Sequence, residues 1–140
     1  MSNITFDKKL QVKTVVQKKG YCKVKLLVKN AHLNYGGIVH GGVITSLCDI
    51  ALAGALHKAM EKDQWCVTIQ LNVEFMNPGF LGDTLFAYGK LIRKGKSLAF
   101  IEGGIELKNK IKIARAHGIW FIKSGPSKKI KIKKPVKKIE

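Results

Sequence analysis

The stretch HLNYGGIVHGGVITSLCDIALAGAL, residues 32–56, decides the fold, because a polar, glycine-rich loop runs there into a long apolar segment. From Val43 to about Lys62 the chain has no proline, is rich in Ala and Leu, and places its apolar residues near helical spacing. Almost no charge interrupts the segment before Lys58, so most of a helix formed here should be buried. The stretch predicts one long helix enclosed by other structure.

The segments on both sides of this helix alternate between apolar and polar residues, which is typical of strands with one wet face. Residues 10–29 form two such runs around the turn QKKGYC. Four further runs follow the helix: WCVTIQLNVEFM at 65–76, TLFAYGKLIR at 84–93, SLAFIEGGIELK at 97–108 and IKIARAHGIWFIK at 111–123. We expect an α+β fold in which one curved antiparallel sheet holds the helix on its concave face. Its exposed edges favour dimerisation by strand pairing.

The length of 140 residues suits a single domain, and 46% apolar with 25% charged residues is ordinary for a folded protein. We expect an N-terminal tail at 1–9, the domain at 10–122 and a lysine-rich, disordered tail at 123–140. The start of the chain has no apolar signal region, and no segment is apolar for long enough to span a bilayer. The three cysteines form no C-x-x-C pair. A cytoplasmic protein is the expectation.

The charge is unusual, since 26 Lys and Arg face 9 Asp and Glu and the net charge is +17. Eight lysines and one acid follow Ile122, and without them +10 remains, so the basic excess extends over the domain. Such an excess suits a polyanionic partner: a nucleotide-bearing ligand, nucleic acid or an anionic membrane. For the tail itself, solvated charge is the favoured interpretation, and contact with nucleic acid or an anionic membrane is the alternative.

Asp49 is unexpected in the apolar run, because a carboxylate among apolar side chains costs several kcal/mol unless it is hydrogen-bonded. One interpretation is a narrow solvent-facing strip beside Thr45 and Ser46. The other is catalytic, because Gly41 and Gly42 stand where the helix begins, and free N–H groups there stabilise negative charge developing on a carbonyl. Asp49 follows Gly42 by seven residues and so lies on roughly the same face. A base and oxyanion donors on one helix suggest an acyl-transfer site.

The motif N-Y-G-G-I-V-H-G-G at 34–42, followed by D-I-A at 49–51, resembles the signature of hotdog-fold thioesterases of the phenylacetic-acid-degradation (PaaI-like) group. The segments VTIQLNVEFMNPGFLGDTL, GKSLAFIEGGIEL and IARAHGIWFI are similar to the strands and turns that follow the helix in that group. The resemblance covers roughly residues 10–122. It implies a hotdog fold, hydrolysis of acyl-CoA thioesters to free acid and coenzyme A, and a homodimer or a homotetramer made of two dimers.

The resemblance also implies a division of labour. The Gly41 N–H would polarise the thioester carbonyl and hold the oxyanion. Asp49 would act as general base on a water or as nucleophile, and both roles stay open. Thr68 would position the water, while Asn34 and His40 would orient the carbonyl and shape the loop. The family takes Asn34, His40 and Gly41 from one subunit and Asp49 and Thr68 from the other, so a dimer would complete each site.

Substrate contacts are expected from Gly42, beside the oxyanion donor, and from Lys90, Arg93, Lys94 and Lys96, whose charges would meet the phosphates of coenzyme A. Each of these basic residues has ordinary solvated charge as its alternative. Coenzyme A is part of the substrate, so the resemblance implies no separate cofactor and no metal.

Other residues near the motif are expected to have structural rather than catalytic roles. Cys48 is taken as core, because burial raises the pKa of a thiol, and His57 and His117 as structural or exposed. Asn34 alone could be a turn former. Two other functions are kept as alternatives. One is a non-catalytic acyl-CoA-binding or regulatory hotdog module, and the other is a hotdog dehydratase or hydratase.

Overall fold

The computed structural model describes residues 4–126 of the chain. Its elements are a short helix α1 (Phe6–Leu10), strands β1 (Lys13–Lys18) and β2 (Tyr21–Leu27), a 3-10 turn η1 (Asn30–His32), the long helix α2 (Gly41–His57), and strands β3 (Gln64–Phe75), β4 (Thr84–Lys94), β5 (Leu98–Glu106) and β6 (Lys112–Ser124). The predicted first hairpin, the long helix and the four later strands are all present. No helix between residues 4 and 126 is long and apolar enough to cross a membrane.

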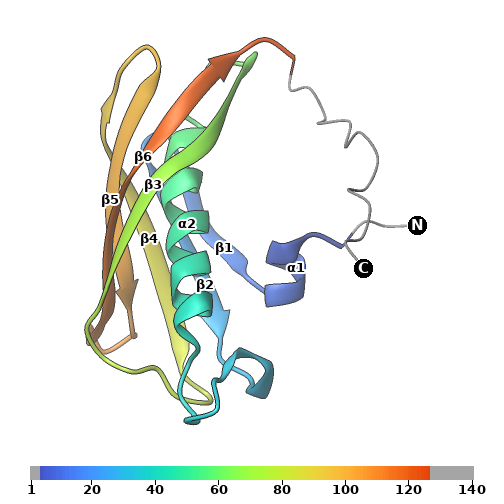
Figure 1. Cartoon of the computed structure of the whole chain (residues 1–140), viewed down its shortest axis with the longest axis vertical. Coiled ribbons are helices and arrows are strands. Elements are labelled where there is room, and N and C mark those ends of the chain that lie inside the picture. Colours follow the sequence, from blue (N-terminus) through green and yellow to red (C-terminus); the bar gives the residue numbers. More distant parts are fainter. Residues whose placement is uncertain (1–3, 127–140) are drawn as a thin grey trace, which may run out of the picture.

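All six strands pair antiparallel in one sheet, in the order β1-β2-β4-β5-β6-β3. Figure 1 shows the sheet curving around α2, which lies along its inner face. This is the predicted α+β hotdog arrangement. The two edge strands are β1, with 6 residues, and β3, with 12, and the outer edge of β3 is unpaired within the described residues.

The core lies between α2 and the inner face of the sheet. Leu52 and Leu56 of α2 and Trp120 of β6 are completely buried. The helix comes close to β4 because Gly89 has no side chain, and a Cβ there would collide with the carbonyl oxygen of Ala51. Since glycine allows this approach, the central helix packs directly on the backbone of β4.

The predicted helix differs from the observed one at both ends and along one face. It begins at Gly41, two residues before the predicted start, because His40 caps it. It ends at His57 rather than near Lys62, since the amides of Ala59 and Met60 both turn back to the Leu56 carbonyl. One strip of α2 is only half-buried or is exposed, and it contains Gly42, Ser46, Asp49, Ile50, Ala53 and His57.

The segment predicted as an N-terminal tail contains a helix instead. The Thr5 hydroxyl caps α1 by accepting from the Lys8 N–H, and Leu10 at its end is buried. The buried His32 ring holds this end in place. Its Nδ1 accepts from the Lys29 N–H at 2.9 Å, so its Nε2 carries the proton and donates to the Leu10 carbonyl at 3.0 Å. The ordering of α1 thus depends on a contact 22 residues away in sequence.

The C-terminal boundary of the domain also differs from the predicted one. Strand β6 continues to Ser124, two residues past the predicted boundary at 122. Residues 127–140, which hold most of the predicted lysine-rich tail, lie outside the described residues.

Candidate active site

Asn34 begins the loop that leads into α2. Its side-chain Oδ1 accepts hydrogen bonds from the N–H groups of Gly36 at 2.9 Å and Ile38 at 3.3 Å. Its own N–H donates to the Ile38 carbonyl at 2.8 Å. Asn34 is therefore a turn former, as its simpler interpretation had it, while its side-chain NH₂ group makes no hydrogen bond within residues 4–126 and stays available as a donor.

His40 caps the N-terminus of α2. Its Nδ1 accepts the Gly42 N–H at 2.7 Å, so the neutral ring carries its proton on the exposed Nε2. Its backbone N–H donates to the carbonyl of His32 at 2.8 Å, which fixes the cap to the preceding turn. Glycine at position 42 lets the His40 ring lie this close, because a Cβ would stand 2.9 Å from the His40 Nδ1.

Gly41 is the first residue of α2, and its N–H has no acceptor in the described part of the chain. The Phe75 ring lies above it, 3.5 Å from where a Cβ would stand. Asn34, Gly41, Phe75 and Met76 line one cavity of about 440 Å³. Gly41, which carries a free helix N-terminal N–H, therefore lines a hollow with mostly apolar walls, which suits a polarised carbonyl beside an apolar group.

Asp49 lies halfway along α2, on the half-buried strip. The Thr68 hydroxyl, on the exposed edge strand β3, donates to Asp49 Oδ1 at 2.8 Å. A second cavity, of about 300 Å³, lies beside Asp49 and is also lined by Ile50, Ala53 and His57. The carboxylate is thus hydrogen-bonded and open to a cavity. Asp49 thus lies on a solvent-facing strip of the helix, and the same position is compatible with a catalytic carboxylate.

Cys48, the neighbour of Asp49, is completely buried, as predicted. Burial, with a smaller effect of the Asp49 charge, raises the pKa of its thiol to about 12. A thiol with this pKa stays protonated at neutral pH and is a poor nucleophile.

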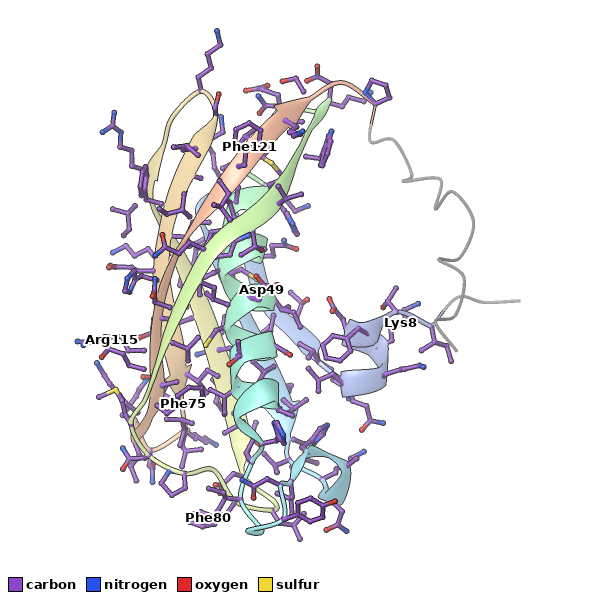
Figure 2. The ribbon with its side chains drawn as sticks, in the orientation of Figure 1. Lys8, Asp49, Phe75, Phe80, Arg115 and Phe121 are labelled. Atoms are coloured by element: carbon purple, nitrogen blue, oxygen red, sulfur yellow. The ribbon has the colours of Figure 1, made fainter. Side chains whose placement is uncertain are left out.

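A single chain does not bring the Gly41 N–H and the Asp49 carboxylate together. Gly41 and Asp49 are eight residues apart on one helix, which corresponds to about 12 Å at 1.5 Å per residue. Figure 2 shows Asp49 midway along α2 and Phe75, which covers Gly41, nearer one end of the sheet. A reacting carbonyl must lie within about 3 Å of both base-bound water and oxyanion donors. The structure therefore assembles Asp49 with Thr68, and Asn34 with His40, Gly41 and Gly42, as two separate half-sites.

The basic candidates lie on and around the β4–β5 hairpin, and all are exposed. Lys90 pairs with Tyr21 and Glu102 within the sheet, while Lys94 is at the end of β4. The registers Lys94↔Ala99, Ala99↔Trp120 and Trp120↔Thr68 put Lys94 level with Thr68. Three strand spacings of about 4.8 Å separate them, roughly 14 Å. Arg93 lies beside Lys94, and Lys96 is in the turn.

His32, which the sequence analysis did not select, holds the loop before α2 in position. Its carbonyl holds His40, and its ring holds Leu10 and the Lys29 amide. Its only sequence signal was its position two residues before Asn34, and nothing in the pattern distinguished it from an exposed loop histidine.

Residues 36–114, more than half of the chain, match the family model described as Thioesterase superfamily. The chain belongs to the Thioesterase superfamily. This thioesterase-superfamily chain is 31% identical to Acyl-coenzyme A thioesterase 13 of Mus musculus over 108 residues, 75% of this chain and 74% of that protein. It is 32% identical over 90 residues, 64% of its length, to a provisionally named esterase of Archaeoglobus fulgidus, and this match spans 56% of that relative.

Two solved structures resemble this chain over most of its length. The E. coli PaaI protein from the phenylacetic acid degradation operon has a TM-score of 0.79 at 27% identity, covering 85% of this chain and 84% of that one. The smu.793 protein of Streptococcus mutans, solved bound to acetyl CoA, has a TM-score of 0.76 at 27% identity, covering 81% and 90%. The predicted hotdog fold and PaaI-like membership are confirmed, and the family is one of thioester hydrolases.

Proposed function

We propose that this protein hydrolyses acyl-CoA thioesters to a free carboxylic acid and coenzyme A. The observation that carries the proposal is the hydrogen bond from Thr68 to Asp49, which orients a carboxylate beside a cavity. Support comes from the relative named as an acyl-coenzyme A thioesterase and from the neighbour solved with acetyl CoA.

In the reaction, Asp49 takes a proton from a water whose oxygen attacks the thioester carbon. The oxyanion of the tetrahedral intermediate accepts from the Gly41 N–H and from Nε2–H of His40. The intermediate then collapses, the C–S bond breaks, and the coenzyme A sulfur takes back the proton. In the alternative route Asp49 itself attacks, forming a mixed anhydride that water hydrolyses. Thr68 serves both routes by holding one carboxylate oxygen and leaving the other free.

We further propose that each site contains residues of two subunits. The two half-sites of one chain lie about 12 Å apart along α2, so a second copy must supply the missing half. Strand β3 offers the contact, because it is a long edge strand on which Val67 and Ile69 are 42% and 56% exposed. Such an edge is prone to pair with another strand, and two-fold symmetry would pair it with itself.

The residue spacing along β3 favours one particular register between the β3 strands of two subunits. Thr68 beside Asp49 and Phe75 above Gly41 are seven residues apart on the same strand. Antiparallel pairing that sets Thr68 opposite Phe75 of the partner subunit would bring Gly41 of the partner subunit toward Asp49. The symmetry would create two identical sites per dimer, and a pair of dimers is compatible with it.

The phosphates of coenzyme A are assigned to Arg93, Lys94 and Lys96, which lie level with or beyond Thr68 on the sheet. Lys90, several residues further down β4, is a weaker candidate for this contact. The chemistry needs no metal or separate cofactor, because the carboxylate supplies the base and the N–H donors stabilise the oxyanion. We place the reaction in the cytoplasm, where the three free thiols would stay reduced.

The test is thiol release from a panel of acyl-CoA substrates, monitored with a thiol reagent, for the wild type and for Asp49→Asn. Release by the wild type that the variant loses supports hydrolysis. Acyl-CoA binding without release from any substrate would instead identify a binding or regulatory module. Absorbance change with enoyl or 3-hydroxyacyl thioesters without thiol release would identify a hydratase or dehydratase.

A further inference from the structure

A third hollow lies among α1, β1 and β2 and has a volume of about 560 Å³. Lysines from four positions line it: Lys8 on α1, Lys13 on β1, Lys25 on β2 and Lys29 just after β2. No acidic residue is part of the lining. None of the residues that line this lysine cleft lines the cavity at Gly41 or the cavity at Asp49, so the thioesterase proposal does not use it.

The charges of the lysine cleft repel one another. Lys13 and Lys25 are direct cross-strand partners in the β1–β2 register, and like charges in that position are destabilising. The ion pairs between residues 4 and 126 join Lys110 to Glu106 and Arg115 to Glu74, so none of the four cleft lysines has a carboxylate partner there. An arrangement that costs stability in the free protein becomes favourable when an anion occupies the cleft.

The walls of the lysine cleft are held in place by His32. Its imidazole joins the Leu10 carbonyl, at the end of the helix that carries Lys8, to the backbone amide of Lys29. The two walls are therefore joined through one buried ring (Figure 2 labels Lys8 on α1). A cleft that is already formed loses less entropy when a ligand binds.

The lining between the lysines is partly apolar. Val12 is half-buried and Leu27 is 52% exposed, while Gln11 and Thr84 add an amide and a hydroxyl. We propose that the lysine cleft binds a linear polyphosphate, either carried on a nucleoside or free as an inorganic chain. The lysines would contact successive phosphates, and the apolar surface of Val12 and Leu27 would contact a base where one is present.

The test uses the full chain and two double variants that each remove two positive charges. Lys13→Gln with Lys25→Gln alters the lysine cleft, and Lys58→Gln with Lys62→Gln alters exposed lysines elsewhere. Calorimetric titration with ATP and with inorganic tripolyphosphate at near-physiological salt should show a Kd at least about tenfold weaker for the cleft variant and within about twofold for the control. Tighter binding of ATP would point to the nucleoside form, and equal binding to the inorganic one.

Acetylation of lysines, read by mass spectrometry, localises the contact. Either ligand should protect Lys8, Lys13, Lys25 and Lys29 and leave Lys58 and Lys62 unprotected. The cleft variant should also raise the Tm of the ligand-free protein at low salt, since it removes a like-charge pair. Absence of binding, equal weakening in both variants, or protection confined to lysines after residue 126 would overturn the proposal. None of these results depends on thioester hydrolysis, so the two proposals fail separately.

Discussion

The Thr68 hydroxyl donates a 2.8 Å hydrogen bond to Asp49 Oδ1, and this contact joins the edge strand β3 to the middle of the central helix. It fixes one carboxylate oxygen and leaves the other to act. It also places the catalytic candidate beside the unpaired edge at which a second subunit would add its own residues. The bond therefore relates the proposed chemistry to the proposed assembly.

Asp49→Asn should lower kcat for acyl-CoA hydrolysis by about 10² to 10⁴, because the amide neither accepts a proton nor attacks the thioester. KM should change little, since the amide keeps an oxygen for Thr68. Thiol release across a range of substrate concentrations gives both values. Circular dichroism and size-exclusion profiles like those of the wild type are the control, and retention of more than about a tenth of kcat would rule out Asp49 as base or nucleophile.

Thr68→Val removes the hydroxyl but keeps the shape, so we expect kcat to fall by about tenfold to a hundredfold through loss of carboxylate orientation. Thr68→Ser retains the donor and should stay within a few-fold of the wild type. Because Thr68 is exposed, both variants should unfold within about 1 kcal/mol of the wild type in denaturant titrations. Equal activity of the Val and Ser variants would show that the hydroxyl has no role.

Gly42→Ala should displace the His40 ring, because the new Cβ would stand 2.9 Å from Nδ1 and 3.2 Å from Cε1. We expect kcat to fall by about 10 to 10² while thermal stability changes little, since Gly42 is exposed in the first turn of α2 and alanine has a higher helix propensity than glycine. The double variant with His40→Ala should be no worse than His40→Ala alone, as the two changes act on the same group. Additive losses would mean that Gly42 acts independently of His40.

Cys48→Ala should leave hydrolysis within about threefold of the wild type, because a buried thiol whose pKa is raised to about 12 is not the nucleophile. Its effect on stability should depend on pH. Above about pH 9 the unfolded chain loses the Cys48 proton while the folded protein keeps it. The folded state then binds more protons, so rising pH destabilises the wild type through this group in the range between about pH 9 and pH 12.

Denaturant titrations of the wild type and Cys48→Ala at pH 8 and pH 10.5 isolate this group from the lysines that titrate nearby. The difference in unfolding free energy between them should shift in favour of the variant at the higher pH. A difference independent of pH would show that the folded protein ionises this thiol as easily as the unfolded chain.

The sequence predicted the fold well because its decisive signals are local. An uninterrupted apolar run without proline indicates a buried helix, and alternating residues indicate strands with one wet face. The motif around Asn34, His40 and Asp49 carried the family assignment. Local patterns could not show which face of α2 packs against the sheet. Gly54 is buried and packs so closely against Cys22 that a Cβ there would collide with the Cys22 side chain, while Ala53 is half-exposed.

The misses share a physical cause, since each depends on partners distant in sequence. Helix α1 has only five residues, too few to be stable by propensity, and it is ordered by the bond from His32 to Leu10. The spacing of Gly42 and Asp49 put both on roughly one face of the helix but did not show how far the oxyanion donor lies from the carboxylate. Gly41 and Asp49 are eight residues apart, about 12 Å along the axis. That separation is the main reason to propose a site shared by two chains.

The most direct test of this central claim is complementation between two inactive variants, His40→Ala and Asp49→Asn, refolded together or expressed together. If each site takes His40 from one subunit and Asp49 from the other, a hybrid dimer contains one doubly altered site and one intact site. Random mixing makes about half of the dimers hybrid, so the mixture should regain about a quarter of the wild-type specific activity. A mixture as inactive as its parents, with hybrid dimers verified by native mass spectrometry, would contradict the shared site.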